Sequence, residues 1–248
     1  MKVGIRTIAV AVIVTALAAD SFGETFPASI SRQPLVAGRV SDRLSIGVGY
    51  DKLERGIEFD NRSEAILEAD TISGYVGYDV LPWLTAFVTL GGTKVELDDG
   101  VASDYGVKFS GGLSAYLWEG DVVVPSFMSG RLSIKAMTDA SRSESDTDVG
   151  SVEWFDVLVA LPFGYEKFDR YPASDSGLQT SLALYAGPAF SYLSGTADTL
   201  SGDRDFDATE QFGLVAGADV YFSPSVSIGA KFLAFDELSY GASARFHF

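Results

Sequence analysis

The chain has 248 residues, enough for one large all-β domain or two small domains, and it contains 26 glycines, 17 phenylalanines, 11 tyrosines and no cysteine. Its 18 basic and 34 acidic residues give a net charge of −16, which argues against nucleic-acid binding because that function needs a basic surface. The lack of cysteine excludes disulfides and thiolate metal sites, and the many aromatic residues argue against a disordered chain.

Residues 1–19 have the pattern of a secretory signal peptide. Lys2 and Arg6 form a positively charged start, residues 7–17 form an apolar run, and residues 16–18 supply small side chains for cleavage. The apolar run is too short to span a bilayer as a helix. We therefore expect the chain to be exported and this segment to be removed.

Residues 20–43 show no clear period, and we interpret them as a leader before the first strand. From Leu44 onward, apolar and polar residues alternate, which predicts strands that have one apolar and one polar face. The alternation predicts ten strands, at about residues 44–51, 66–78, 84–90, 105–117, 124–136, 155–165, 182–192, 212–222, 226–234 and 238–248.

The segments between the predicted strands are of two kinds. Tight turns are predicted at residues 79–83, 119–121 and 223–225. Longer polar loops are predicted at about residues 60–63, 98–100, 138–150, 166–177 and 195–209. Because the tight turns fall mostly at one end of the strands and the longer loops mostly at the other, the pattern is typical of outer-membrane barrels.

We therefore predict an all-β fold for residues 44–248, an antiparallel up-and-down transmembrane β-barrel of about ten strands, with eight as the alternative count. Aromatic residues gather near both ends of the strands, as they do in the two interfacial girdles of such barrels. A soluble β-sandwich would also alternate, but it explains the girdles and the loop asymmetry poorly.

The last strand, residues 238–248, becomes more aromatic toward its end. In a closed barrel this strand pairs with the first, so that neither edge is left open. Its ending, Tyr240-x-x-x-x-x-Phe246-x-Phe248, together with the signal and the alternating strands, resembles small Gram-negative outer-membrane barrels of the OmpA/OmpX-like group. The resemblance implies that Tyr240, Phe246 and Phe248 form the signal read by the barrel insertion machinery. It also implies a location in the outer membrane, in contact with membrane lipid and lipopolysaccharide.

Charged residues of both signs fall on the polar face of the strands, which faces the lumen of such a barrel. Barrels of eight to ten strands leave an interior that side chains nearly fill, so we expect these charges to pair and to plug the lumen. Glycines on the same face leave room for a narrow pore as the alternative. The predicted lumen-lining residues are Asp51, Lys108, Arg131, Lys135, Asp219, Lys231 and Arg245.

Candidate catalytic and metal-binding residues are few. The sole histidine, His247, has no carboxylate near it in the local sequence, so we expect no enzyme. The acidic stretches at residues 144–148 and 203–207 alternate like the start of a calcium loop, but they lack the glycine and glutamate that such a loop needs at positions 6 and 12. We expect no catalytic, cofactor-binding or metal site.

Three functions are compatible with the sequence. The first is a monomeric barrel with a structural or envelope-interaction role and acidic extracellular loops. The second is a narrow passive channel for ions or small solutes, and the third is an adhesin or receptor that acts through its extracellular loops.

Overall fold

The computed structural model describes residues 43–60, 63–97, 101–102, 104–124, 128–147, 150–168, 181–199, 202–223 and 225–248. The predicted signal peptide and all but the last residue of the predicted leader lie outside these ranges. No helix in the described ranges is long and apolar enough to cross a membrane. The strands are β1 (Leu44–Phe59), β2 (Glu64–Leu81), β3 (Leu84–Leu97), β4 (Val101–Ala102), β5 (Gly106–Val124), β6 (Met128–Thr147), β7 (Gly150–Ala160), β8 (Phe163–Phe168), β9 (Ser181–Thr199), β10 (Gly202–Ala208), β11 (Phe212–Ser223), β12 (Val226–Ala234) and β13 (Leu238–His247).

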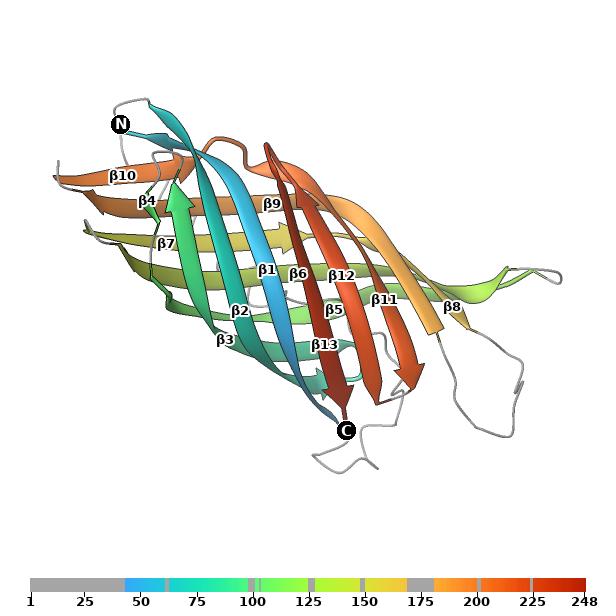
Figure 1. The fold of residues 1–248 in the computed structure, drawn as a ribbon. Coiled ribbons are helices and arrows are strands. Elements are labelled where there is room, and N and C mark those ends of the chain that lie inside the picture. Colours follow the sequence, from blue (N-terminus) through green and yellow to red (C-terminus); the bar gives the residue numbers. More distant parts are fainter. Residues whose placement is uncertain are drawn as a thin grey trace.

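The strands form one closed antiparallel barrel (Figure 1). Around its middle, each strand pairs with its neighbour in the chain, in the order β1, β2, β3, β5, β6, β7 with β8, β9, β11, β12 and β13. β13 then pairs with β1, from Ser45 opposite His247 to Lys52 opposite Tyr240. The predicted antiparallel barrel of ten strands is confirmed, with the last strand closing on the first.

β7 and β8 together make up one predicted strand, and both pair with β6 and β9. The strand is interrupted at Pro162, which has no N–H to give to a ladder. Residues 161 and 162 are still hydrogen-bonded to the strands on both sides. The Pro162 carbonyl accepts from the Lys135 N–H of β6 at 3.0 Å, and the Leu161 N–H donates to the Pro188 carbonyl of β9 at 3.0 Å. Pro162 therefore bends the strand without opening the wall of the barrel.

Apolar side chains cover the outside of the barrel. Val48, Leu90 and Leu214 are each more than 60% exposed. On the inside, Thr93 and Asp219 are fully buried. This distribution is the reverse of that in water-soluble proteins, and it fits a barrel whose outer wall contacts lipid.

Several strands are longer than the sequence predicts, and two predicted loops are wrong. The segment predicted as a loop at 138–150 is the end of β6 as far as Thr147, and the segment predicted as a loop at 195–209 is a hairpin of β9 and β10. In β6, Ser141, Ser143 and Ser145 are buried inside the barrel while the residues between them face out. Both faces are polar where a strand extends past the apolar belt, so its composition is similar to that of a loop.

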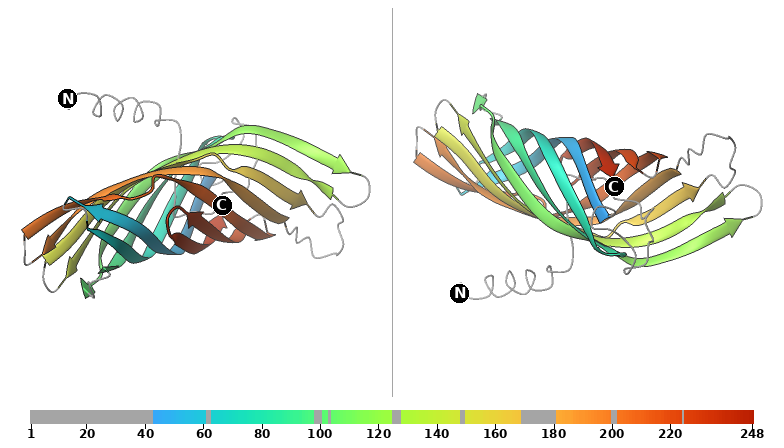
Figure 2. Two further views of the ribbon diagram at one scale, coloured as in Figure 1. Left: turned by 90° about the horizontal axis from the view of Figure 1, so that it is seen from above. Right: turned by 90° about the horizontal axis from the view of Figure 1, so that it is seen from below.

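The tight turn predicted at 119–121 is also wrong. β5 continues to Val124, with Glu119 opposite Ser133 and Asp121 opposite Arg131 on β6. The resulting β5–β6 hairpin extends beyond the other strands at the end of the barrel where the chain terminus Phe248 lies, called the terminus end below (Figure 2). Gly120 and the two acidic residues fit a turn by composition, but long-range pairing with β6 keeps them in a strand.

The remaining connections are partly as predicted. Pro82 and Trp83 connect β2 to β3, and β11 ends at Ser223 just before β12, so these two tight turns are confirmed. The loop at 60–63 is confirmed between Phe59 and Glu64, whereas residues 98–100 lie outside the described ranges. The predicted difference in loop length has an exception at the far end, where β6 ends at Thr147 and β7 begins at Gly150. This connection is as short as the tight turns of the opposite end.

At the far end, opposite the terminus end, the barrel is built from fewer strands. β1 leaves β13 after Lys52 and pairs instead with β10 at residues 57–59, while β9 pairs with β10 at residues 194–199. A single strand, β10, thus takes the place of β11, β12 and β13. Because strand number sets the diameter of a barrel, the lumen narrows here.

Candidate functional site

The narrow far end of the lumen holds a group of apolar side chains from β1, β2, β3, β7, β9 and β10, called the far-end cluster below. Phe59 and Phe206 meet edge to face at 5.8 Å between ring centroids. Each member is at most 7% exposed. The far-end cluster consists of Ile57, Phe59, Leu67, Ala69, Val95, Val152, Trp154, Leu193, Ala197 and Phe206. These side chains therefore form an apolar core at this end of the barrel.

The middle of the lumen is polar, and the predicted charged residues lie there. Asp51 on β1 and Lys231 on β12 form an ion pair of 2.7 Å, with side chains 15% and 8% exposed. The pair bridges across Gly241 on β13, which stands opposite both residues. A Cβ atom on Gly241 would collide with the Asp51 carboxylate, so the absence of a side chain there makes room for the pair.

A second group of predicted residues lies closer to the terminus end. Asp219 is fully buried, and its charge acts on the buried Lys135 and on Tyr185. The Lys135 ammonium also lies 4.4 Å from the centroid of the Tyr116 ring. Arg245 is 4% exposed, and its guanidinium lies 5.1 Å from the centroid of the Tyr75 ring.

The other two predicted charges occupy different environments. Lys108 on β5 acts electrostatically on Asp139 and Asp156, which lie on β6 and β7. Arg131, in contrast, lies at the terminus end and pairs at 3.0 Å with Asp121, whose side chain is 60% exposed. Arg131 therefore belongs to the mouth of the lumen and not to its buried middle.

A buried charge with several partners, Arg55, is absent from the predicted lumen-lining residues. Its side chain is 1% exposed and donates to Ser191 Oγ at 2.9 Å and to the Glu210 carbonyl at 2.6 Å. Its Nε lies 3.4 Å from Asp236 Oδ1, and its guanidinium lies 4.1 Å from the centroid of the Phe235 ring. Arg55 thus ties β1 to β9 and to the two segments that precede β11 and β13.

The sequence carried signals for two of the three residues that were missed. Arg55 continues the inward alternation of Asp51, beyond the predicted end of the first strand. Asp156 alternates with the apolar residues of a predicted strand, whereas Asp139 falls inside the segment that was predicted as a loop. Ser191 Oγ donates to Asp156 Oδ1 at 2.7 Å, so Asp156 joins the Arg55 network.

His247 has a partner that lies distant in sequence. Its Nε2 is 3.0 Å from the hydroxyl oxygen of Ser227, and its ring lies 6.0 Å from that of Tyr221. Ser227 is 2% exposed. A serine and a histidine at this distance form part of a hydrolytic arrangement, but a nucleophile buried to this degree has no surface on which a substrate could dock.

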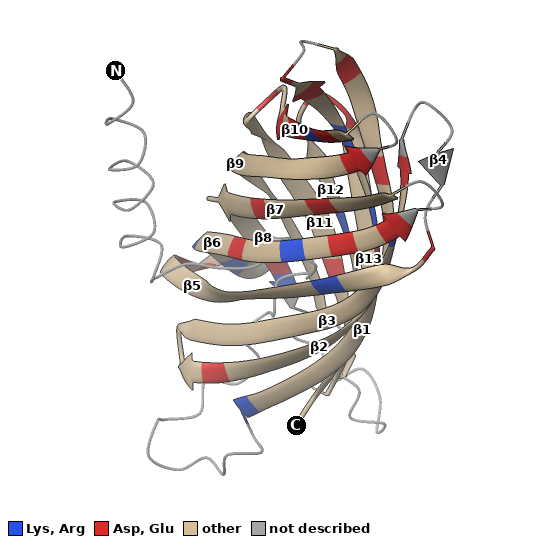
Figure 3. Cartoon of the chain, turned by 90° about the vertical axis from the view of Figure 1, so that its left-hand side faces the viewer, with Lys and Arg blue, Asp and Glu red and all other residues tan. Residues whose placement is uncertain are grey.

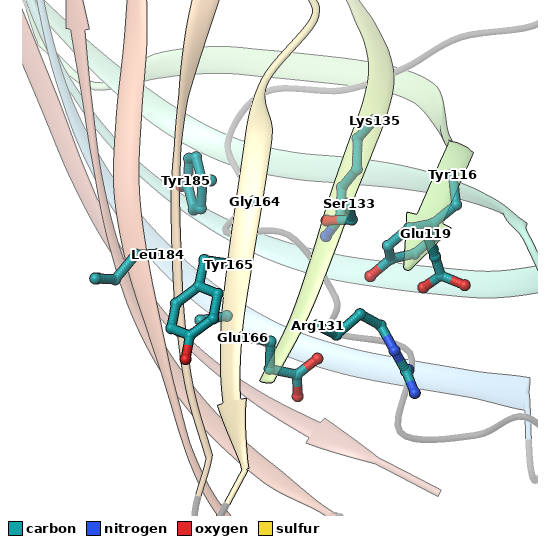
Figure 4. Close-up of a pocket in the computed structure, with 11 residues that line it drawn as sticks. Tyr116, Glu119, Arg131, Ser133, Lys135, Gly164, Tyr165, Glu166, Leu184 and Tyr185 are labelled. Carbon is teal, nitrogen blue, oxygen red and sulfur yellow. The ribbon is translucent and has the colours of Figure 1, made fainter. Parts of the chain in front are cut away.

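A small cavity of about 20 Å³ lies at the terminus end, on the inner face of β6, β8 and β9 (Figure 4). Its lining includes two charges of each sign, from Arg131, Lys135, Glu119 and Glu166. A space of this volume holds about one water molecule. The cavity therefore has the size of a hydration site.

The three residues of the predicted insertion signal lie on the outer face of β13 and after its end. Tyr240, Phe246 and Phe248 are 41%, 44% and 51% exposed. The Phe246 and Phe248 rings meet edge to face at 4.9 Å, and the Phe248 N–H donates to the Leu44 carbonyl at 3.1 Å. The aromatic end of the chain is thereby fixed against the first strand.

Acidic side chains cover the outer face at the far end, on strands and not in loops. In Figure 3, which shows the barrel from that end, Asp and Glu occur on β6, β7, β9 and β10. Asp203, Asp205 and Asp207 all face out from β10, so their alternation is that of a strand. Among the described residues, no three His, Asp or Glu side chains are grouped closely enough to hold a metal ion.

A closed antiparallel barrel with an apolar outer face and a polar lumen is the architecture of outer-membrane β-barrel proteins. No protein-family model and no curated protein matches the chain. Among solved structures it is similar to the outer membrane protease OmpT from Escherichia coli, with 11% identity and a TM-score of 0.40 over 86% of this chain and 99% of that chain.

Two further likenesses involve barrels of other kinds. One is to the β-domain of the Bordetella autotransporter BrkA, with 13% identity and a TM-score of 0.34 over 82% of this chain and 99% of that one. The other is to the CymD monoaromatic hydrocarbon channel, with 11% identity and a TM-score of 0.25 over 84% and 89%. The fold class of this chain rests on its own strand pairing and outer surface.

Proposed function

We propose that this protein is a monomeric, non-enzymatic barrel of the Gram-negative outer membrane, with a structural or envelope-interaction role. The observation that carries the proposal is the far-end cluster, in which residues such as Trp154 and Phe206 fill the narrow end of the lumen. Buried ion pairs such as Asp51–Lys231 occupy the middle. A lumen filled in this way favours a structural role over a passive channel.

We further propose that the apolar belt contacts membrane lipid, and that the acidic outer face at the far end lies among the polar groups of lipopolysaccharide. Supporting this orientation, Phe248 and the start of β1 lie together at the opposite end, where a newly exported chain would begin to close the barrel. In this account the barrel insertion machinery reads the aromatic end of β13 from the periplasmic side.

Planar-bilayer recording distinguishes the structural role from the channel. The protein, once folded and inserted, is expected to give no steady single-channel steps. Steady steps would favour the narrow passive channel. The adhesin or receptor alternative would act through the same acidic far end, and it predicts saturable binding of a partner that is lost when the carboxylates of β10 are neutralised.

A further inference from the structure

The two faces of β10 have opposite effects on its docking to the barrel. Its inner face holds Phe206, which is 2% exposed and packs against Phe59. Its outer face presents Asp203, Asp205 and Asp207 to solvent. The inner face draws the strand onto the barrel, whereas the charge of the outer face acts against its docking.

Two of these aspartates stand directly opposite other carboxylates. Asp207 faces Glu58 on β1, which in turn faces Glu64 on β2, and Asp203 faces Asp198 on β9. Directly opposed like charges destabilise a pair of strands, because their Cβ atoms are only about 5 Å apart. Within the described part of the chain, none of these five carboxylates forms an ion pair.

The third aspartate differs in its neighbour. Asp205 stands opposite Thr196, whose hydroxyl donates to Asp205 Oδ1 at 2.9 Å. The backbone carbonyl of Asp205 also accepts from the Asp60 N–H at 3.1 Å. Asp205 therefore helps to hold β10 in place and provides a natural control for the other two.

The remaining anchors of β10 are few. Arg204, the one cation on the strand, donates to Ser63 Oγ at 2.7 Å and lies 4.0 Å from the centroid of the Phe59 ring. β10 pairs with β9 over six residues but with β1 over only three, and the Thr209 N–H that follows it donates to the Gly56 carbonyl of β1 at 3.0 Å. The turn into β10 passes through Gly202, whose φ of 110° is a conformation that glycine adopts readily.

We propose that β10 is a charge-sensitive closing strand. Its docking between β1 and β9 is weakest at low ionic strength and strengthens when salt screens the opposed carboxylates. When β10 detaches, the edges of β1 and β9 separate from it, Phe206 leaves the far-end cluster, and the far end of the lumen opens. This strand would then control access to the lumen from outside, a regulation beyond the structural role proposed above.

Amide hydrogen exchange in detergent micelles, resolved to residues 203–207, tests the proposal at 10 mM and at 1 M NaCl. The Debye length falls from about 30 Å to about 3 Å over this range. The repulsion between the carboxylates is therefore present at 10 mM NaCl and screened at 1 M NaCl. Screening one opposed pair should slow amide exchange in β10 by roughly 1.5- to 5-fold. With two such pairs, we expect the protection of β10 to rise about 2- to 25-fold between the two salt concentrations.

Two variants assign the effect to its charges. Asp203→Asn and Asp207→Asn together should give high protection at both salt concentrations. Asp205→Asn, which removes the same charge from a position opposite a threonine, should keep the salt dependence of the native protein. Exchange of β10 that does not depend on salt, or loss of the salt dependence in Asp205→Asn as well as in the double variant, would overturn the proposal. Neither result bears on membrane insertion, and the bilayer recordings test separately whether the ion-paired middle of the lumen conducts.

Discussion

Arg55 joins parts of the chain that lie far apart in sequence. It carries a charge at 1% exposure, which is tolerated only because Ser191, the Glu210 carbonyl and Asp236 surround the guanidinium. Removal of one partner from such a group leaves uncompensated polar atoms inside the protein. The cost of losing a buried ion pair in this way is about 3–5 kcal/mol.

Arg55→Ala should therefore lower the free energy of unfolding in detergent micelles by about 3–5 kcal/mol, measured by urea denaturation. Arg142→Ala is the matched control, since Arg142 also pairs with a carboxylate, at 2.6 Å from Glu153, but its side chain is 64% exposed. The control substitution should lower the free energy of unfolding by less than about 1 kcal/mol. Equal effects of the two substitutions would show that Arg55 is not the anchor described here.

The Asp51–Lys231 pair allows a second test at this scale. A double-mutant cycle with Asp51→Asn and Lys231→Met should give a coupling energy of about 0.5–3 kcal/mol, because the two side chains touch and are mostly buried. The measurement is again urea unfolding in micelles. A coupling energy near zero would mean that the two charges act independently in the folded barrel.

At the level of strands, the alternation of apolar and polar residues alone located all ten strands of the barrel, because each strand has one apolar and one polar face. It failed where both faces are polar. β6 beyond Thr138 and the β9–β10 hairpin extend past the apolar belt, and their serines and aspartates are indistinguishable from loop residues by composition. Only the long-range ladder, with Ser143 between Lys108 and Trp154, reveals the strand.

The amide hydrogens of residues 141–146 should accordingly exchange as slowly as those of residues 132–136 in the same strand. Residues 141–146 pair with β7 and residues 141–144 also with β5, residues 132–134 pair with β5 and β8, and the Lys135 N–H donates to the Pro162 carbonyl. Amides in such interior strands open only with the surrounding structure. Hydrogen-exchange mass spectrometry on the native protein measures this. If the amide hydrogens of residues 141–146 exchanged within seconds, this segment would be a loop, as its composition suggests, and not part of β6.

β13 tests the role of the aromatic chain end. Phe246→Ala combined with Phe248→Ala should reduce the amount of barrel assembled in cell membranes while leaving refolding into detergent nearly unchanged. Phe232→Ala is the control, because Phe232 is 48% exposed on the outer face of the adjacent β12. If assembly falls equally in the control, the effect comes from lost lipid contact and not from a signal in β13.

For the whole molecule, the sequence predicted closure but not the change in strand number along the axis. The narrowing depends on β10 pairing with both β9 and β1. β9 is its neighbour in the chain, whereas β1 lies far away in sequence, with Phe59 opposite Phe206. No local pattern encodes the pairing with β1. The far-end cluster and the Arg55 network both follow from that narrowing, which is why neither was predicted.

The central claim is that the chain forms a closed barrel with a lipid-facing outer wall. After refolding into lipid vesicles, the unheated protein should migrate on a denaturing gel faster than the heated protein, because a closed barrel resists detergent unfolding and stays compact. A chain that migrates identically in both states, and that remains a soluble monomer without detergent, would contradict this account.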